Sequence, residues 1–139
     1  MREFIKVMKA LSDPNRVKIV KLLQHRVLCV CEIQALLGLA QSTASKHLKV
    51  LEEAGLVDAV KEGQWVNYRP ATGTRSVYAT ALLVHLRQWL DDDDAFLALL
   101  HRLPTVQRED IRGSCGSAAP VTQKNMLNPD IPDFHSTRR

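Results

Sequence analysis

The chain has 139 residues, a hydrophobic content of 45% and a formal net charge of +4, values typical of one globular domain with a modest tail. No apolar stretch approaches the ~20 residues that span a bilayer, and the charged N-terminus does not resemble a signal peptide. We therefore expect a cytoplasmic protein with no membrane partner, and the basic balance is compatible with a nucleic-acid partner.

Two amphipathic helices are predicted first. One covers residues 4–11, and the second starts after Asp13 and ends near residues 24–26. Asp13 can cap the free amide groups of the second helix, and Pro14 suits its first position. The apolar stripes are Phe4, Val7, Met8 and Leu11 in the first helix and Ile19, Val20 and Leu23 in the second.

A helix-turn-helix is predicted next. An apolar segment, 27–31, can be a short extended piece, and residues 32–37 are helical until Gly38, which can end the helix in a left-handed turn. Residues 40–54 resume the helical pattern. This second helix exposes short polar and cationic side chains that can reach phosphates and base edges in a major groove. The candidate DNA-binding residues are Gln41, Ser42, Thr43, Ser45, Lys46 and His47.

Residues 57–69 predict a β-hairpin with Glu62-Gly63 as its two-residue turn. The facing pairs would then be Val57 with Tyr68 and Ala59 with Val66, all on one buried face. A hairpin directly after a helix-turn-helix is a wing. The predicted fold class is therefore mainly α with a small β-hairpin wing (α+β), a winged helix-turn-helix.

The C-terminal part predicts a longer helix over residues 75–90. Little chain remains to cover its apolar face, so we expect a homodimer through the first and last helices. The acidic run 91–94 is expected to be a solvated helical segment, with helix continuing until Leu103-Pro104. We expect a DNA-binding and dimerisation domain over 1–103 and a flexible tail over 104–139. The apolar face comprises Tyr78, Ala81, Leu82, Leu86 and Trp89.

The three cysteines are Cys29, Cys31 and Cys115, and in a cytoplasmic chain this pattern does not make a disulfide framework. Thiolates select soft ions. Side chains at i and i+2 point ~200° apart in a helix but to the same side in an extended segment. Binding of one ion by Cys29 and Cys31 therefore requires the start of the following helix to unwind or shift. Simple core packing of the two thiols and a redox switch stay open.

Three stretches of the chain resemble the ArsR/SmtB metal-sensing repressors, and most closely the arsenite-responsive ArsR branch. They are LCVCE at 28–32, QSTASKHLKVLEEAGLV at 41–57 and EGQWVNYR at 62–69. The resemblance covers roughly residues 4 to 103. It implies a homodimer that binds double-stranded operator DNA, represses a resistance operon and dissociates when As(III) or Sb(III) binds the cysteine thiolates. It also implies that the wing, with Lys61 and Gln64, contacts the flanking minor groove.

The sequence departs from the family pattern in two places. Members of this branch often carry a third cysteine where this chain has Gln34, and the paired Asp/His ligands of the zinc-binding branches are not matched by His85 and His101. The candidate metalloid ligands are therefore Cys29 and Cys31 with Cys115, an external thiol such as glutathione, or no third ligand at all. The inducer is the only ligand implied, and no cofactor is required.

No catalytic constellation is present, so we do not expect an enzyme. The chain lacks a nucleophile–base–acid set, a glycine-rich phosphate loop and a zinc-hydrolase motif. A small arsenate-reductase-like enzyme would need a nucleophilic cysteine in a phosphate-binding loop with a nearby arginine, which residues 28–32 lack. A redox-sensing repressor, a regulator responding to another soft ion such as Cd(II), and a winged helix that binds protein rather than DNA stay open.

Overall fold

The structure is a computed structural model that describes residues 1–73 and 75–107. Cys115 and residues 108–139 of the predicted tail lie outside the described residues. None of the helices described is long and apolar enough to cross a membrane. The elements are α1 (Arg2–Ala10), α2 (Pro14–His25), β1 (Leu28–Cys29), α3 (Val30–Leu37), α4 (Gln41–Glu53), β2 (Val57–Glu62), β3 (Trp65–Pro70), α5 (Val77–Leu86), α6 (Asp94–Arg102) and the 3-10 helix η1 (Leu103–Thr105).

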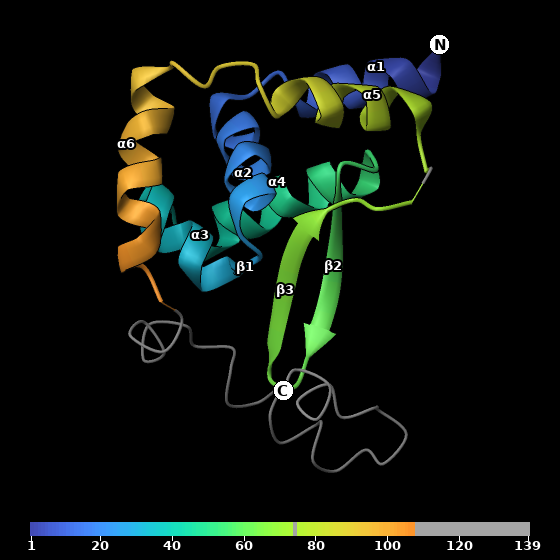
Figure 1. Ribbon diagram of the computed structural model, residues 1–139. Coiled ribbons are helices and arrows are strands. Elements are labelled where there is room, and N and C mark those ends of the chain that lie inside the picture. Colours follow the sequence, from blue (N-terminus) through green and yellow to red (C-terminus); the bar gives the residue numbers. More distant parts are fainter. Residues whose placement is uncertain (74, 108–139) are drawn as a thin grey trace.

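The helices surround α2, and the hairpin of β2 and β3 projects from them (Figure 1). Helices α1 and α5 lie side by side at the end opposite the hairpin tip, whereas α6 packs against α2 and α3. Helix α4 contacts both α2 and α3, so the two helices of the predicted helix-turn-helix share one core with the rest of the domain. The larger apolar side chains that fill this core with 0–1% exposure are Val7, Ile19, Val20, Leu22, Leu28, Ile33, Leu36, Leu48, Leu51, Leu56 and Val57.

Local signals place the predicted helix ends correctly. Asp13 Oδ1 accepts hydrogen bonds from the amides of Asn15 at 2.8 Å and Arg16 at 3.2 Å, and Pro14 is the first residue of α2. Gly38 ends α3 in the left-handed region at φ 66°, a conformation that glycine adopts without steric cost. The predicted start of the second helix after Asp13 and the predicted end of the third helix at Gly38 are therefore both confirmed.

The wing has a different register from the predicted one. Glu62 pairs with Trp65, so the two-residue turn is Gly63-Gln64, and Ala59 faces Tyr68 instead of Val66. The turn begins at Gly63, which has φ 59°, because the glycine supplies the positive φ at the first turn position. Ala59 is exposed as well, since none of the described helices covers the outer part of the projecting hairpin.

A third strand extends the sheet beyond the predicted hairpin. Strand β1 pairs antiparallel with β3, with Leu28 opposite Tyr68 and Cys29 opposite Asn67, which gives the strand order β1-β3-β2. The extended piece expected over residues 27–31 is thus confirmed and confined to two residues. It joins the start of α3 directly to the wing.

The predicted long C-terminal helix is divided into α5 and α6. Helix α5 ends at Leu86, and Leu90 adopts φ 64° in the connector, a conformation in which a side chain is strained. The buried Lys21 Nζ donates to the carbonyl oxygens of Leu86 and Trp89 and to Asp91 Oδ1. The acidic run is solvated as predicted, but the helical expectation is wrong for residues 91–93, because Lys21 binds the carbonyl groups where α5 ends, and Asp93 caps α6, which starts at Asp94.

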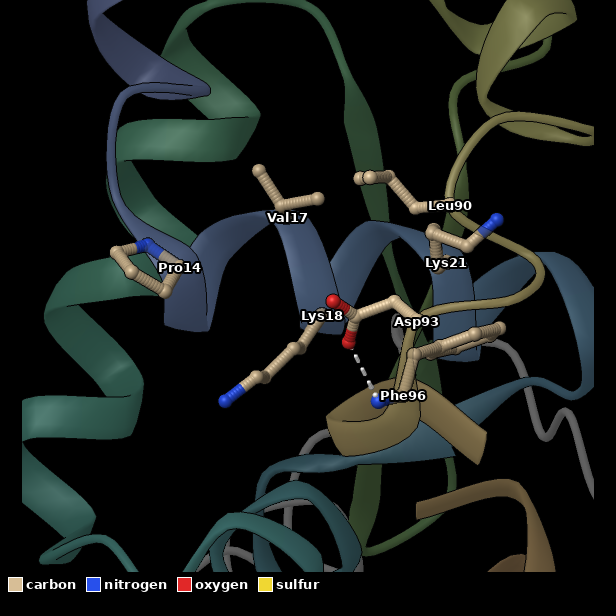
Figure 2. Close-up of a pocket in the computed structure, with 7 residues that line it drawn as sticks. All are labelled: Pro14, Val17, Lys18, Lys21, Leu90, Asp93 and Phe96. Carbon is tan, nitrogen blue, oxygen red and sulfur yellow. Dashed lines mark hydrogen bonds between the residues drawn. The ribbon is translucent and has the colours of Figure 1, made fainter. Parts of the chain in front are cut away.

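A small apolar pocket of about 180 Å³ lies between α2 and this connector. Figure 2 shows Pro14, Val17 and Lys21 on one side and Leu90 and Phe96 on the other. The ammonium group of Lys21 lies 4.6 Å from the centre of the Phe96 ring, a favourable cation–π distance. The pocket thus lies beside the contact between Lys21 and Phe96, where the connector between α5 and α6 packs against α2.

Candidate nucleic-acid interface and cysteine site

Helix α4 presents the polar face that the sequence predicts. Its apolar residues Ala44, Leu48 and Leu51 are buried, which turns the other side of the helix to solvent. The exposed candidate DNA-binding residues are Ser42, Thr43, Ser45 and Lys46. Gln41 and His47 are half-buried at the edges of this face. The structure thus brings the four short polar and cationic side chains onto one accessible surface.

The wing residues Lys61 and Gln64 lie at the distal end of the hairpin. Lys61 is the penultimate residue of β2, and Gln64 is in the turn. Both are half-buried. The hairpin projects away from the helices (Figure 1), a shape that suits contact with a groove beside the one that a recognition helix enters.

The cysteine pair spans the junction between β1 and α3. Cys29 has extended backbone angles, φ −89° and ψ 169°, and is the N-cap residue of α3, whereas Cys31 is the second residue of that helix. Their exposed fractions are 2% and 4%, and Trp65 of the wing packs against both. Cys29 therefore already has the extended backbone that binding of one ion by both cysteines requires. Cys31 does not, because it lies in the first turn of α3.

Glu32 joins the cysteine pair to the C-terminal part of the domain. Its Oε1 accepts the Cys29 amide proton at 3.0 Å, and its Oε2 lies 2.9 Å from Arg26 Nη2. Arg26 also donates to the carbonyl oxygens of Leu103 and Val106 at 3.0 and 2.7 Å. Sequence reasoning missed both residues, although the Cys29-x-x-Glu32 spacing is that of a capping box and could have indicated Glu32.

The Cys29 thiol is protonated at neutral pH in this environment. Burial raises its pKa to about 11, and the neighbouring Glu32 carboxylate opposes ionisation as well. Thiolate is the form that binds soft ions, so the closed site disfavours binding. The expectation of reduced cysteines holds for Cys29, which is free, but is wrong for Cys31, which takes part in a disulfide. This bond must be reduced before the Cys31 sulfur can bind an ion.

The donor set within residues 1–73 and 75–107 is incomplete for a three-coordinate ion. These residues contain no cluster of three or more His, Cys, Asp or Glu side chains that could hold a metal ion. Cys29 and Cys31 belong to one buried cluster at the start of α3, and their sulfur atoms fit a soft ion by their chemistry. Any third ligand must come from elsewhere. The structure places His85 stacked on Trp89, with ring centres 4.7 Å apart.

Comparison with known proteins agrees with this arrangement. Residues 13–59 match the family described as bacterial regulatory protein, arsR family. The uncharacterized HTH-type transcriptional regulator MJ1325 of Methanocaldococcus jannaschii is 46% identical over 63 residues, which are 45% of this chain and 71% of that protein. This chain belongs to the arsR family of bacterial regulatory proteins.

Two relatives within the arsR family carry names that refer to resistance. The cadmium resistance transcriptional regulatory protein CadC of Listeria innocua is 46% identical over 61 residues, 43% of this chain and 51% of that protein. The arsenical resistance operon repressor of Escherichia coli is 42% identical over 66 residues, 47% of this chain and 56% of that protein. This arsR-family chain therefore spans about half the length of these two regulators.

Two solved structures share the fold of this arsR-family chain. Reduced HlyU from Vibrio cholerae has a TM-score of 0.53 and 31% identity, covering 63% of this chain and 87% of that one. The homodimeric winged helix-turn-helix DNA-binding domain Mb0332 from Mycobacterium bovis has a TM-score of 0.55 and 29% identity, covering 67% and 82%. The predicted winged helix-turn-helix fold is thus confirmed.

Proposed function

We propose that this arsR-family chain is a repressor that binds double-stranded operator DNA as a homodimer and is released when As(III) or Sb(III) binds its cysteine thiolates. One observation carries the proposal: the Cys29–Cys31 pair lies at the first turn of α3, the helix immediately before the exposed polar helix α4. A ligand at that turn acts on the first helix of the helix-turn-helix.

The DNA-binding part of the proposal rests on α4 and the wing. The exposed Ser42, Thr43, Ser45 and Lys46 reach phosphates and base edges in the major groove, and Gln41 and His47 complete the surface at its edges. Lys61 and Gln64 at the wing tip contact the flanking minor groove. The relatives' names support regulation of transcription in resistance to arsenicals or cadmium.

The dimer part of the proposal rests on an uncovered apolar face. Helices α1 and α5 lie side by side (Figure 1) and expose large apolar side chains by 38–68%. Faces of this kind on a soluble domain mark association sites, and a second copy of the chain matches them by two-fold symmetry. The residues are Phe4, Ile5, Met8, Val77, Tyr78 and Val84.

Release follows from the strain that a shared ligand places on α3. Cys29 is extended, but Cys31 is held in the helix, so convergence of the two sulfurs requires residues 30–32 to leave the helical state. This change breaks the hydrogen bond from the Cys29 amide to Glu32. It also exposes the Cys29 thiol to water, which lowers the pKa that burial had raised. The displaced α3 then shifts α4, which packs against it.

The third ligand is proposed to be Cys115 or an external thiol. Cys115 lies outside the described residues, and As(III) with only two protein sulfurs is the remaining possibility. Absorption of the As–thiolate complex separates two from three sulfur ligands. The Cys115→Ser variant loses the three-sulfur spectrum if Cys115 is a ligand and keeps it if an external thiol serves.

The test is operator binding by fully reduced protein. A labelled duplex from the region upstream of the gene is titrated by fluorescence anisotropy, with and without stoichiometric As(III) or Sb(III). We expect metalloid to weaken binding by about 5- to 150-fold, the range of typical allosteric coupling. The Cys29→Ser and Cys31→Ser variants should bind DNA like the wild type but lose the response. Unchanged affinity with metalloid bound to the protein would reject release by As(III).

The disulfide at Cys31 supports a second candidate function, a thiol redox-sensing repressor. Hydrogen peroxide oxidises two thiols to a disulfide and is itself reduced to water. In the same assay, release by peroxide that dithiothreitol reverses, with no response to metalloid, would favour this function. A response to Cd(II) alone would favour a cadmium regulator.

A further inference from the structure

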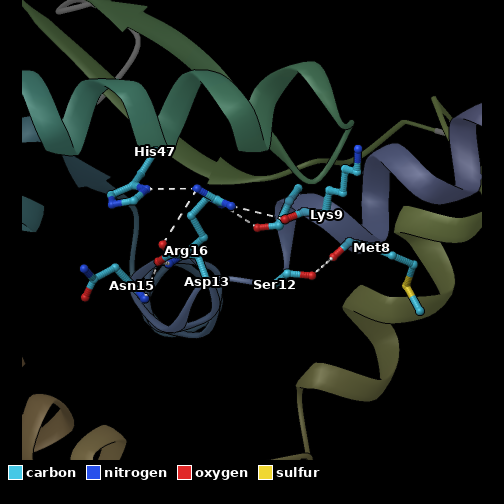
Figure 3. A network of polar contacts seen from close by, with 8 residues as sticks. Met8, Lys9, Ser12, Asp13, Asn15, Arg16 and His47 are labelled. Atoms are coloured by element: carbon cyan, nitrogen blue, oxygen red, sulfur yellow. Dashed lines mark hydrogen bonds and ion pairs between the residues drawn. The ribbon is translucent and has the colours of Figure 1, made fainter.

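Three helices meet at the side chain of Arg16, which is 19% exposed at the start of α2. Its Nε donates to the carbonyl oxygen of Ala10 at 2.6 Å and its Nη2 to that of Lys9 at 3.1 Å, both near the C-terminus of α1. Its Nη1 lies 3.3 Å from Nδ1 of His47 on α4 and 3.9 Å from Asp13 Oδ2. Figure 3 shows the guanidinium between these groups.

The chemistry of the two partners decides which atom accepts in this contact. A guanidinium has donors but no acceptor. In the contact with Arg16, His47 Nδ1 is therefore the acceptor. The imidazole thus uses one nitrogen for a contact inside the protein.

Asp13 fixes the other side of the guanidinium. Partial burial of its carboxylate, which raises the pKa, is outweighed by hydrogen bonds from the amides of Arg16 and Asn15, so the pKa of Asp13 lies below its ordinary value. The carboxylate is therefore ionised at neutral pH, and it both caps α2 and faces Arg16. The network ties the end of α1, the start of α2 and the middle of α4 together.

We infer that Arg16 and His47 are positioning residues that fix the angle between α4 and α1, a role that rests on the proposed DNA binding. Because α1 belongs to the proposed dimer face, this angle determines whether both recognition helices of a dimer reach their half-sites together. This reassigns His47, which the sequence predicts to contact DNA: it borders the exposed surface of α4 but acts through Nδ1 and Arg16, so its effect on DNA is indirect. Arg16 acts through the orientation of α4 and makes no phosphate contact.

A matched pair of substitutions at His47 tests the role of Nδ1. In Asn the amide oxygen is bonded to Cγ, as Nδ1 is, whereas in Gln the amide lies one bond further out, near the position of Nε2. We expect His47→Asn to keep operator affinity within about threefold and His47→Gln to weaken it about tenfold, the effect of one lost hydrogen bond to a charged group. Binding of the wild type and both variants is measured at the same pH and salt concentration.

The salt dependence tests the role of Arg16. Arg16→Met should weaken binding at least about tenfold without changing the slope of log affinity against log salt, because no phosphate contact is lost. Lys46→Met, the control on the exposed face of α4, should lower that slope by about 1 for each contact removed. Adding His47→Gln to Arg16→Met should cause little further loss, because the two residues share one contact.

Several results would overturn the inference. Retained affinity in His47→Gln with loss of affinity in His47→Asn would identify a DNA contact by Nε2. Wild-type affinity in both His47 variants would show that Nδ1 has no positioning role. A reduced salt slope in Arg16→Met would show that Arg16 contacts a phosphate. Urea unfolding of both His47 variants verifies equal folding, so the Asn and Gln comparison decides the matter even if Arg16→Met does not fold. Failure of the wild type to bind any duplex would instead refute the proposed function.

Discussion

Lys21 shows how one charged side chain can determine where a helix ends. Only 2% of the residue is exposed, and its ammonium group is bound by two carbonyl oxygens and the Asp91 carboxylate. Burial of a charge is tolerated only when its hydrogen bonds are satisfied in this way. The same contacts terminate α5 and hold Leu90 in its positive-φ conformation.

Lys21→Met should lower the free energy of unfolding by about 2–4 kcal/mol, because it leaves buried acceptors without a donor. Urea denaturation monitored by circular dichroism measures the change. Lys18→Met is the control, since Lys18 is on the same helix and its side chain makes no hydrogen bond or ion pair with the residues that the structure describes. Equal effects of the two substitutions would show that the contacts of Lys21 do not stabilise the connector.

The raised pKa of Cys29 predicts a loss of stability in alkali. The folded state keeps the thiol protonated up to its raised pKa of about 11, whereas the unfolded chain releases the proton near the ordinary cysteine pKa of 9.0. The stabilising contribution is therefore complete below pH 9 and is lost as the pH rises from 9 to 11. Urea midpoints of reduced protein across this range should fall more steeply for the wild type than for Cys29→Ala.

This comparison also removes the contribution of other groups that titrate in alkali. Burial raises the pKa of Tyr68 as well, and Tyr68 is present in both proteins. Parallel decline of the wild type and Cys29→Ala would mean that the thiol is not protected from ionisation in the folded protein.

An arginine from outside α3 binds each end of this helix: Arg26 at its start and Arg102 at its end. Arg26 binds Glu32 at its start, and Arg102 of α6 donates to the carbonyl oxygens of Leu36 and Ala35 at 2.9 and 3.1 Å. These carbonyl groups are among the last four of the helix, which have no partner within it. Helix α6 thus stabilises the element that carries the cysteine site.

Arg102→Met should destabilise the domain by about 0.5–1.5 kcal/mol, the usual net effect of lost hydrogen bonds at a partly exposed site. Amide hydrogen exchange over residues 36–39 should become faster, because the last turn of α3 frays. Arg87→Met, at an exposed arginine that makes no described side-chain bond, should change neither quantity. Unchanged exchange in Arg102→Met would show that α6 does not hold this end of α3.

At the scale of the whole molecule, the apolar face of α1 and α5 determines the expected assembly. Val77 and Val84 are 68% and 55% exposed, and Phe4 contacts Tyr78 edge to face at 5.4 Å between ring centres. The two helices therefore form one continuous surface. Because α1 is also held to α4 through Arg16, the proposed association at this face would fix the relative placement of the two proposed DNA-binding surfaces.

Val84→Glu should shift the protein toward monomer and raise the dimer dissociation constant at least about tenfold, because each copy would bury an unpaired carboxylate. Sedimentation equilibrium measures the change. Val27→Glu, at a 45% exposed position between α2 and β1, is the control and should leave assembly unchanged. A stable dimer in Val84→Glu would place the interface elsewhere.

The sequence by itself determined the helix-turn-helix, the wing and the cysteine pair. These depend on local signals: the Asp13-Pro14 start, the left-handed Gly38 and the alternation of the hairpin, each of which acts within a few residues of the chain. The exposed face of α4 followed from the same helical periodicity. The hairpin register was predicted incorrectly because two adjacent positions could each form the turn.

Only the tertiary structure decided the contacts between distant residues. The end of α5 depends on Lys21, 65 residues away along the chain from Leu86, and the burial of Cys29 depends on a wing that pairs with β1. Arg16 and His47 are 31 residues apart, so no local pattern indicates that they meet. Such contacts arise because a packed core leaves buried charges and free helix ends that only particular distant groups can satisfy.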